Sequence, residues 1–319
     1  RAALLAEALA FFAPSLEVLV FPAWDCLPYD RVSPNGGIVA KRIDTLTRLL
    51  ARKADSPPLV VLTTVNAMVQ KVPPRAAFRN AVFSAKVRDR IDLEKLQRYL
   101  AGNGYTRAQT VREPGEFAIR GGIVDLFPPG TDEPLRLDLF GDELEAVRSF
   151  DPMSQRTTDK RDGLDLKPMS EVFLDEASIA RFRSGYRELF GAVTDDDPLY
   201  EAISAGRKYG GMEHWLPLFH ESLDALPAYM PKGILSLDHQ ATESRDSRIA
   251  QVVDFHASRD SMMVIEKRAG SPVYKPVPVG MMFLDAQAWD DIFAAHAVAQ
   301  LQPFGTPPGI KGTVDAGGR

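Results

Sequence analysis

The chain has 319 residues, of which 45% are hydrophobic and 25% charged, so it is long enough for two compact units with separate cores and is not a disordered tail. Its formal net charge of -5 argues against a protein whose main task is to neutralise nucleic-acid phosphates. A single cysteine excludes an internal disulfide, and no apolar run approaches the roughly eighteen residues of a transmembrane helix. We therefore expect a cytoplasmic protein without a membrane partner.

The beginning of the chain alternates between helical and strand-like patterns. Residues 4–12 have a helical pattern, and residues 16–21 form an apolar run of strand length before a loop rich in Pro, Asp and Gly. Apolar side chains recur at helical spacing over residues 39–50, and residues 59–62 form a second strand. Strands separated by a helix predict a βαβ unit with a parallel sheet.

The pattern changes after two prolines at residues 73–74. Residues 81–87 alternate as a strand, and Asp92 stands at the N-cap position of a helix over residues 93–100. Four short antiparallel strands are then expected, at residues 117–119, 123–127, 135–140 and 144–150. Gly141-Asp142 favours a two-residue hairpin, because a tight primed turn needs a positive φ at a central position.

A mixed helix and strand pattern resumes after residue 166. Residues 178–190 are predicted as a helix, and residues 233–237 and 262–266 have the length of strands. The predicted fold class is α/β with an inserted α+β domain. The expected divisions are a flanking α/β domain in two parts (1–74 and 166–300), the insertion (75–165), and a linker rich in Pro, Gly and Ala (301–319).

Familiar arrangements of catalytic and ligand-binding residues are missing from the sequence. There is no G-x-x-x-x-G-K-[ST] loop to cradle nucleotide phosphates, and the five histidines lack the spacing of a zinc site. Glu213-His214 with His220 is the nearest approach to a cluster, and we interpret it as structural, at a strand or loop edge. Cys26 has no nearby histidine and is interpreted as a small buried hydrophobe. We expect no catalytic residue, metal or cofactor in this chain.

The strand over residues 135–140 places different side chains on its two faces. Its three leucines share one face, while Arg136, Asp138 and Phe140 share the other. Arginine and aromatic residues are enriched among the hot spots of protein interfaces. A simpler alternative is that Phe140 folds under a neighbouring loop or helix and that Arg136 pairs with Asp138 or Asp142.

The strand over residues 117–119 repeats this arrangement. Phe117 and Ile119 are core-like, which sends Arg120 to the outer face just before a pair of glycines. The alternative for Arg120 is a solvated charge at a sheet edge, with little effect on stability. Arg120, Arg136 and Phe140 together predict a recognition patch for a carboxylate-bearing protein partner, because guanidinium pairs bidentately with carboxylates.

Three blocks of sequence resemble the transcription-repair coupling factor (Mfd) family. The first is FPAWDCLPYD at residues 21–30, and the third is EHWLPLF at residues 213–219. The second and most specific is EPGEFAIRGGIVDLFP at residues 113–128, which resembles the UvrA-interaction domain shared by Mfd and UvrB. The resemblance extends from about residue 5 to residue 300. Together with the start at Arg1, it indicates a segment of a longer protein.

The resemblance implies a UvrB-like split parallel-sheet domain with an inserted antiparallel-sheet domain that binds UvrA. The family's UvrA-contacting residues, two arginines and a phenylalanine, fall on Arg120, Arg136 and Phe140. The family also implies an intramolecular C-terminal domain that covers the UvrA surface. RNA polymerase, double-stranded DNA, ATP and magnesium would be bound by motor domains outside this chain.

An alternative within the resemblance is a UvrB-type, nucleotide-dependent protein that binds damaged DNA. UvrB has a long Tyr-rich hairpin after its equivalent of Tyr29, whereas only a short stretch separates Tyr29 from the helix that begins near Gly37. The short loop and the net negative charge favour the coupling factor.

Overall fold

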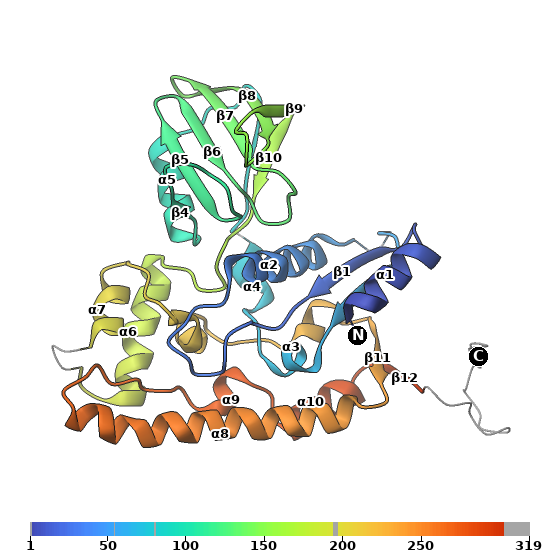
Figure 1. Cartoon of the computed structure of the whole chain (residues 1–319), viewed down its shortest axis with the longest axis vertical. Coiled ribbons are helices and arrows are strands. Elements are labelled where there is room, and N and C mark those ends of the chain that lie inside the picture. Colours follow the sequence, from blue (N-terminus) through green and yellow to red (C-terminus); the bar gives the residue numbers. More distant parts are fainter. Residues whose placement is uncertain (1, 54, 80, 194–196, 303–319) are drawn as a thin grey trace.

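The computed structural model describes residues 2–53, 55–79, 81–193 and 197–302. The fold mixes helices and strands in several small sheets, as the predicted fold class requires at this coarse level (Figure 1). An inserted unit, from β3 to β10, stands on a flanking unit that comprises all the other elements (Figure 1). The expected linker at 301–319 lies almost entirely outside the described residues.

The first part of the flanking unit contains the predicted βαβ arrangement. Strands β1 and β2 pair in parallel, with Val18 opposite Val60, and α2 connects them. Asn35 caps α2 by accepting a hydrogen bond from the Gly37 N–H. The elements are α1 (Ala2–Phe12), β1 (Glu17–Phe21), α2 (Gly36–Ala51), β2 (Leu59–Thr63), α3 (Val65–Val69) and α4 (Arg75–Arg79).

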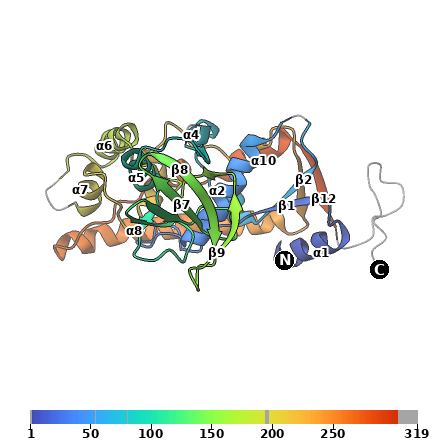
Figure 2. The same ribbon diagram turned by 90° about the horizontal axis from the view of Figure 1, so that it is seen from above.

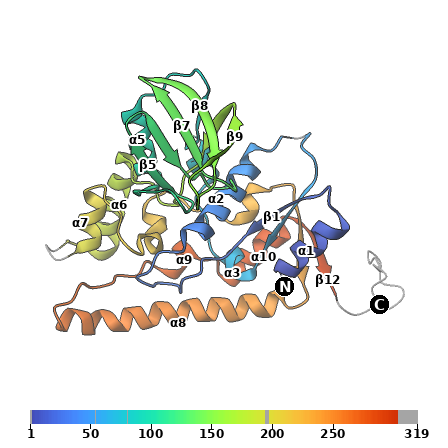
Figure 3. The ribbon, with the colours of Figure 1, turned by 45° about the horizontal axis from the view of Figure 1, so that its top comes forward.

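The second part of the flanking unit is mainly helical, and α8 runs along the side opposite the inserted unit (Figures 1 and 3). Strands β11 and β12 form a second parallel pair. The elements are α6 (Glu176–Phe190), α7 (Pro198–Ser204), the 3-10 helices η1 (Met212–Leu218) and η2 (Leu226–Tyr229), β11 (Ile234–Asp238), α8 (Ala241–Arg268), α9 (Val279–Met282), α10 (Ala286–Ala294) and β12 (Ala297–Leu301).

The prediction of a strand at residues 262–266 is wrong, because this run is part of α8. No glycine or proline interrupts the chain from residue 241 to residue 268, so the helix continues to Arg268 and ends before Gly270, which has a φ of +65°. Val264 and Ile265 are 55% and 67% exposed, so the run is not a buried strand. A short apolar run does not by itself distinguish the two structures.

The inserted unit is built on a six-stranded sheet of order β4-β5-β6-β7-β8-β9, which Figure 2 shows from above. Its pairs are antiparallel except for β4 with β5, and a separate antiparallel pair joins β3 to β10. The elements are β3 (Phe83–Lys86), α5 (Leu93–Gly102), β4 (Thr106–Arg107), β5 (Glu116–Arg120), β6 (Ile123–Leu126), β7 (Leu135–Phe140), β8 (Glu143–Phe150), β9 (Thr157–Arg161) and β10 (Gly163–Leu166).

Each unit has its own core. Helix α5, capped by Asp92 as predicted, buries Leu96 and Leu100 against Val124 and Leu137 on one face of the six-stranded sheet. The flanking core is larger and richer in aromatic rings, including Phe182 stacked on Phe219 with ring centroids 4.9 Å apart. Because α5 covers one face of the six-stranded sheet, the opposite face is the outer face of the inserted unit.

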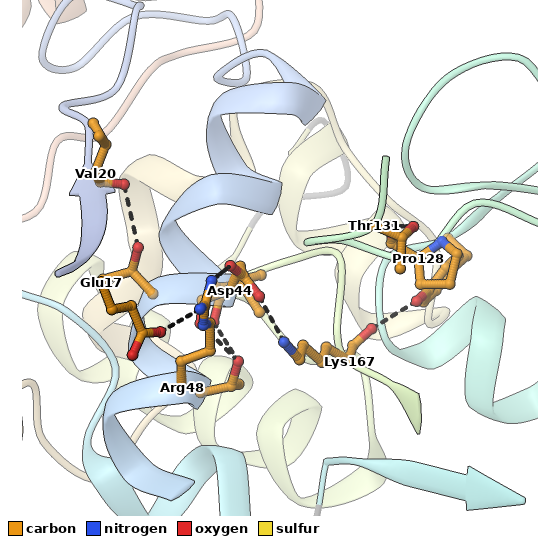
Figure 4. Close-up of polar contacts among 11 residues, drawn as sticks. Glu17, Val20, Asp44, Arg48, Pro128, Thr131 and Lys167 are labelled. Atoms are coloured by element: carbon orange, nitrogen blue, oxygen red, sulfur yellow. Dashed lines mark hydrogen bonds and ion pairs between the residues drawn. The ribbon is translucent and has the colours of Figure 1, made fainter. Parts of the chain in front are cut away.

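The two units are joined through a row of charged side chains around α2. Lys167, just after β10, donates to Asp44 Oδ1 at 2.6 Å, and Arg48 lies between Asp44 and Glu17 (Figure 4). Gly130 of the inserted unit packs on Asp44 with a φ of +78°, and a Cβ at this position would collide with the carboxylate. Helix α2 therefore supports the base of the inserted unit.

Candidate functional site

The strand register places the predicted patch on the outer face of the six-stranded sheet. Asp125 on β6 pairs with Ala118 on β5 and with Arg136 on β7, so these three residues share one face. Arg120 lies two residues beyond Ala118 on the same face, at the start of the Gly121-Gly122 turn. The side-chain alternation used to predict the patch thus places both arginines on one surface.

Asp125 holds the two arginines together. Its carboxylate is fully buried and accepts bidentate hydrogen bonds from Arg136, Nε to Oδ1 at 2.7 Å and Nη2 to Oδ2 at 2.9 Å. Arg120 Nη2 also donates to Oδ2. The hydrogen bonds to Asp125 raise the pKa of Arg136. One buried carboxylate therefore orients two guanidinium groups. Together, the three side chains retain a net positive charge.

Arg136 is the more constrained of the two arginines. Its guanidinium lies over the Phe150 ring, 4.8 Å from the centroid, and Nη1 donates to the Gln155 carbonyl at 3.4 Å. Phe150 belongs to a small second cluster on this face, with Val111, Ala118 and Phe127. The Arg136 side chain is only 19% exposed, whereas that of Arg120 is 53% exposed. Arg120 is the more accessible of the two.

Phe140 lies at the end of the same strand with its ring in solvent. It is 76% exposed, while the preceding Leu139 packs against the core beneath the sheet. The turn that follows is the predicted two-residue hairpin, with Gly141 at a φ of +62° and Phe140 opposite Glu143. The alternative in which Phe140 is covered by a neighbouring loop or helix does not fit this exposure.

The ion pairs on this face differ from those expected in the simpler alternative to a recognition patch. Arg136 pairs with Asp125 rather than with Asp138 or Asp142. Asp138 pairs with Arg148 on the adjacent strand, and Asp142 lies 3.6 Å from Arg90. The aligned strand positions could have indicated Asp125, because a residue directly opposite Arg136 on an antiparallel neighbour lies beside it.

Ile123 is a further residue of this face that the sequence analysis did not single out. It is 39% exposed and pairs with Arg120 on one side and Asp138 on the other. The face therefore combines exposed apolar groups, Ile123 and Phe140, with two oriented guanidinium groups. This combination is typical of a protein-recognition surface, and it contains no nucleophile with an adjacent base.

Outside this face, the fold brings Cys26 and His214 together, which the sequence interpretation of Cys26 did not anticipate. The Sγ and Nε2 atoms are 3.9 Å apart although the residues are 188 positions apart in the chain. Burial raises the pKa of the Cys26 thiol to about 12 and lowers the pKa of His214 to about 4. Both groups are neutral near pH 7, so they do not form a thiolate–imidazolium nucleophile.

The Glu213-His214 segment lies in the 3-10 helix η1 rather than at a strand or loop edge. Glu213 accepts a hydrogen bond from Ser33 Oγ at 2.7 Å, and burial raises the pKa of its carboxyl group. His220 Nε2 lies 2.8 Å from the Glu171 carbonyl. Within the described ranges there is no group of three or more His, Cys, Asp or Glu that could hold a metal ion. No described helix is long and apolar enough to cross a membrane.

Comparison with known families finds one matching domain model. Residues 83–172, which include the six-stranded sheet and α5, match the UvrB interaction domain. The match also covers the segment that returns from the sheet to the flanking unit.

Comparison with individual proteins finds similarity over most of the chain. A transcription-repair-coupling factor of Haemophilus influenzae is 34% identical over 238 residues, 74% of this chain and 20% of that protein. The corresponding proteins of Escherichia coli K12 and Myxococcus xanthus are 33% and 37% identical, over 85% and 72% of this chain and 22% and 20% of their own lengths. The chain thus spans about a fifth of the length of these relatives.

Proposed function

The chain is a homologue of the transcription-repair-coupling factors and carries a UvrB interaction domain, and from this premise we propose that it is a non-catalytic docking module that recruits UvrA. The outer face of the inserted unit is the proposed contact surface. We propose that Arg120, Arg136 and Phe140 are its principal contacts, as the family resemblance implies.

The observation that carries this proposal is the arrangement of both arginines on the single buried carboxylate of Asp125 beside the exposed Phe140. An arginine fixed in orientation loses less side-chain entropy on binding, so its remaining N–H groups can engage an acidic partner at lower cost. Phe140 supplies apolar area that is already in solvent before binding.

The roles of the wider protein belong to the same proposal. We propose that this docking step serves transcription-coupled excision repair at stalled RNA polymerase. ATP-driven movement on double-stranded DNA, contact with the polymerase and masking by a C-terminal domain would depend on regions outside these 319 residues. The two parallel strand pairs, β1–β2 and β11–β12, are proposed to belong to one UvrB-like split domain.

Calorimetric titration of the chain with UvrA tests the contact surface. We expect Arg120→Ala, Arg136→Glu and Phe140→Ala each to weaken binding by about 2 kcal/mol or more, because truncated interface hot spots have losses of this size. Circular dichroism and urea unfolding establish that each variant keeps its fold.

Matched controls come from exposed residues of the same types elsewhere. Phe12→Ala removes an aromatic ring that is 81% exposed on α1, and Arg161→Ala removes an exposed arginine on β9. Both controls are expected to bind UvrA like the unmodified chain. Unchanged binding by folded Arg120→Ala and Phe140→Ala variants would overturn the assignment of the surface.

A further inference from the structure

The turn between β8 and β9 holds one residue in a strained backbone conformation. Gln155 has a φ of +61°, in the left-handed region that residues other than glycine rarely adopt. Its N–H donates to the Asp151 carbonyl at 2.8 Å, and the Asp151 N–H donates to the Arg156 carbonyl at 2.9 Å. The Asp151 carboxylate also accepts from the Ser154 N–H at 2.6 Å. These bonds close the turn and keep Gln155 in the left-handed conformation.

The Gln155 side chain fastens this turn to the outer face of the sheet. Its Nε2 donates to the Val111 carbonyl at 3.0 Å and to the Pro152 carbonyl at 2.7 Å. Val111 is fully buried in the small cluster that includes Phe150, on which the Arg136 guanidinium lies. The amide thus fixes the turn relative to Arg136.

The strained turn places a backbone carbonyl beside Arg136. The Gln155 oxygen accepts from Arg136 Nη1 at 3.4 Å, while the Asp125 carboxylate binds Nε and Nη2. A guanidinium has five N–H groups, and these three bonds leave two of them free, one on each terminal nitrogen. Such a pair matches the two oxygens of a carboxylate. Gln155 therefore helps to determine which N–H groups of Arg136 a partner can reach.

Arg120 lacks an additional contact of this kind. Among the described residues its guanidinium donates only to Asp125, and its side chain is 53% exposed. The Arg136 guanidinium is held at one edge by Asp125 and on one face by the Phe150 ring, and its Nη1 has the third contact. Of the two arginines, Arg136 is the one whose orientation is fixed before a partner binds.

We propose that Gln155 is a positioning residue for UvrA recognition that acts through Arg136. The left-handed conformation of Gln155 directs its carbonyl to one N–H group of Nη1, so that the free pair on the terminal nitrogens meets a single carboxylate of UvrA. This inference rests on the proposed docking function. It adds a role for a residue that is not itself one of the proposed contacts.

Two substitutions separate the backbone conformation of Gln155 from its side chain. Gln155→Val and Gln155→Gly both remove the amide, but glycine accepts a positive φ whereas β-branched valine does not. In calorimetric titration with UvrA, we expect Gln155→Val to weaken binding by about tenfold and Gln155→Gly by about threefold or less.

A matched control comes from a second glutamine of the inserted unit. Gln109 is exposed, has no positive φ and lies in the loop before β5 that also contains Val111. Gln109→Val makes the same change of side chain without opposing the backbone conformation. It is expected to bind UvrA like the unmodified chain.

A double-mutant cycle shows whether Gln155 acts through Arg136. Arg136→Lys keeps the positive charge but loses the planar fork of N–H groups, so it is expected to weaken binding by about tenfold. Adding Gln155→Val to Arg136→Lys should weaken binding further by less than about twofold, because the group that Gln155 orients is already lost. A residue with only a structural role would weaken binding by the same factor in both backgrounds.

Circular dichroism and urea denaturation establish that each variant keeps its fold. If Gln155→Val does not fold, Gln155→Ala takes its place, because alanine also disfavours a positive φ. Equal losses for the valine and glycine variants, or the same factor in both backgrounds of the cycle, would overturn the positioning role. If Arg136→Lys binds too weakly to measure, the comparison of valine with glycine decides alone.

The unmodified chain separates a failure of this inference from a failure of the proposed function. If it binds UvrA and Gln155→Val binds equally well, the positioning role is wrong while the docking function stands. If the unmodified chain does not bind UvrA, both are wrong.

Discussion

The chain contains two arginine–carboxylate sites that use the same chemical groups in opposite ways. In the flanking unit, Arg42 on α2 pairs bidentately with Glu171, and the two side chains are 0% and 1% exposed. In the inserted unit, Asp125 is equally buried, but Arg120 and Arg136 are 53% and 19% exposed. Both side chains of the Arg42–Glu171 pair are buried, whereas the Asp125 site exposes its guanidinium groups to solvent.

The surroundings of Arg42 explain why its pair is structural. The guanidinium lies 4.3 Å from the centroid of the Phe21 ring, and Nη1 donates to the Pro22 carbonyl at 2.9 Å. Glu171 belongs to the segment that returns from the inserted unit. Arg42 thus holds the loop that follows β1, helix α2 and the segment that returns from the inserted unit together at one point. The two sites differ in the exposure of their guanidinium groups rather than in the pairing itself, and we propose recognition only for the exposed one.

Breaking the Arg42 pair should produce the largest effect on stability. Arg42→Ala leaves the Glu171 carboxylate buried without its partner, and we expect a loss of about 3–5 kcal/mol in the free energy of unfolding. Urea denaturation followed by circular dichroism measures this loss. The double variant Arg42→Met with Glu171→Leu should recover much of it, because it removes both buried charges. A loss below about 1 kcal/mol for Arg42→Ala would contradict the structural role.

The pH dependence of stability should come from the flanking unit. The pKa of His214 is about 4 in the folded chain and about 6.5 when unfolded, so between these values the unfolded state binds more protons. The free energy of unfolding should therefore fall by about 2 kcal/mol from neutral pH to about pH 5 through this residue.

Urea denaturation of His214→Gln at the same two pH values isolates this contribution. The variant should lose less stability on acidification than the unmodified chain. Burial also lowers the pKa of His220, so part of the pH dependence is expected to remain. An identical pH dependence in both proteins would exclude His214 as a source.

The sequence predicts the residues of the outer sheet face only where their positions follow from the alternation of side chains along one strand. Alternation along β5 and β7 was sufficient to place Arg120, Arg136 and Phe140, and Gly141 indicated the adjacent turn. Asp125 required the register between strands, since its two partners come from β5 and β7.

Contacts between distant segments could not be predicted from local patterns. The approach of Cys26 to His214 depends on the packing of the loop between β1 and α2 against η1. The prediction of a strand at residues 262–266 was wrong because the length of a short apolar run does not distinguish a strand from part of a helix, and the uninterrupted helix around it determines the backbone.

Asp125→Asn tests the intermediate case of a buried carboxylate with exposed partners. The amide keeps the shape but loses the charge and one acceptor oxygen. We expect a loss of about 1–2 kcal/mol in the free energy of unfolding, smaller than for Arg42→Ala because both arginines can be rehydrated. We also expect UvrA affinity to fall by about tenfold, because the guanidinium groups lose their fixed orientation.

Urea denaturation and calorimetric titration of the same protein sample separate the two effects of Asp125→Asn. Asp138→Asn is the control, since it removes a carboxylate from the same face that pairs with Arg148 instead. Full UvrA binding by Asp125→Asn would show that the arginines do not need this orienting contact.

The junction between the units should show the smallest effect on stability. Lys167 and Asp44 are 22% and 15% exposed and lie 2.6 Å apart. Partial exposure screens this pair, so Lys167→Met is expected to lower the free energy of unfolding by about 1 kcal/mol or less. Lys160→Met, on the exposed β9, is the control and should have no measurable effect.

The junction pair should act on local motion more than on global stability. Lys167 donates to the Asp44 carboxylate (Figure 4). Gly130 packs on the same carboxylate, so removing the ammonium group removes one of two contacts at the base of the inserted unit. Hydrogen exchange should become faster in the 128–131 turn of Lys167→Met, while exchange in β6 and β7 stays slow. A loss of stability as large as that of Arg42→Ala would instead show that Lys167 has a structural role like that of the buried Arg42–Glu171 pair.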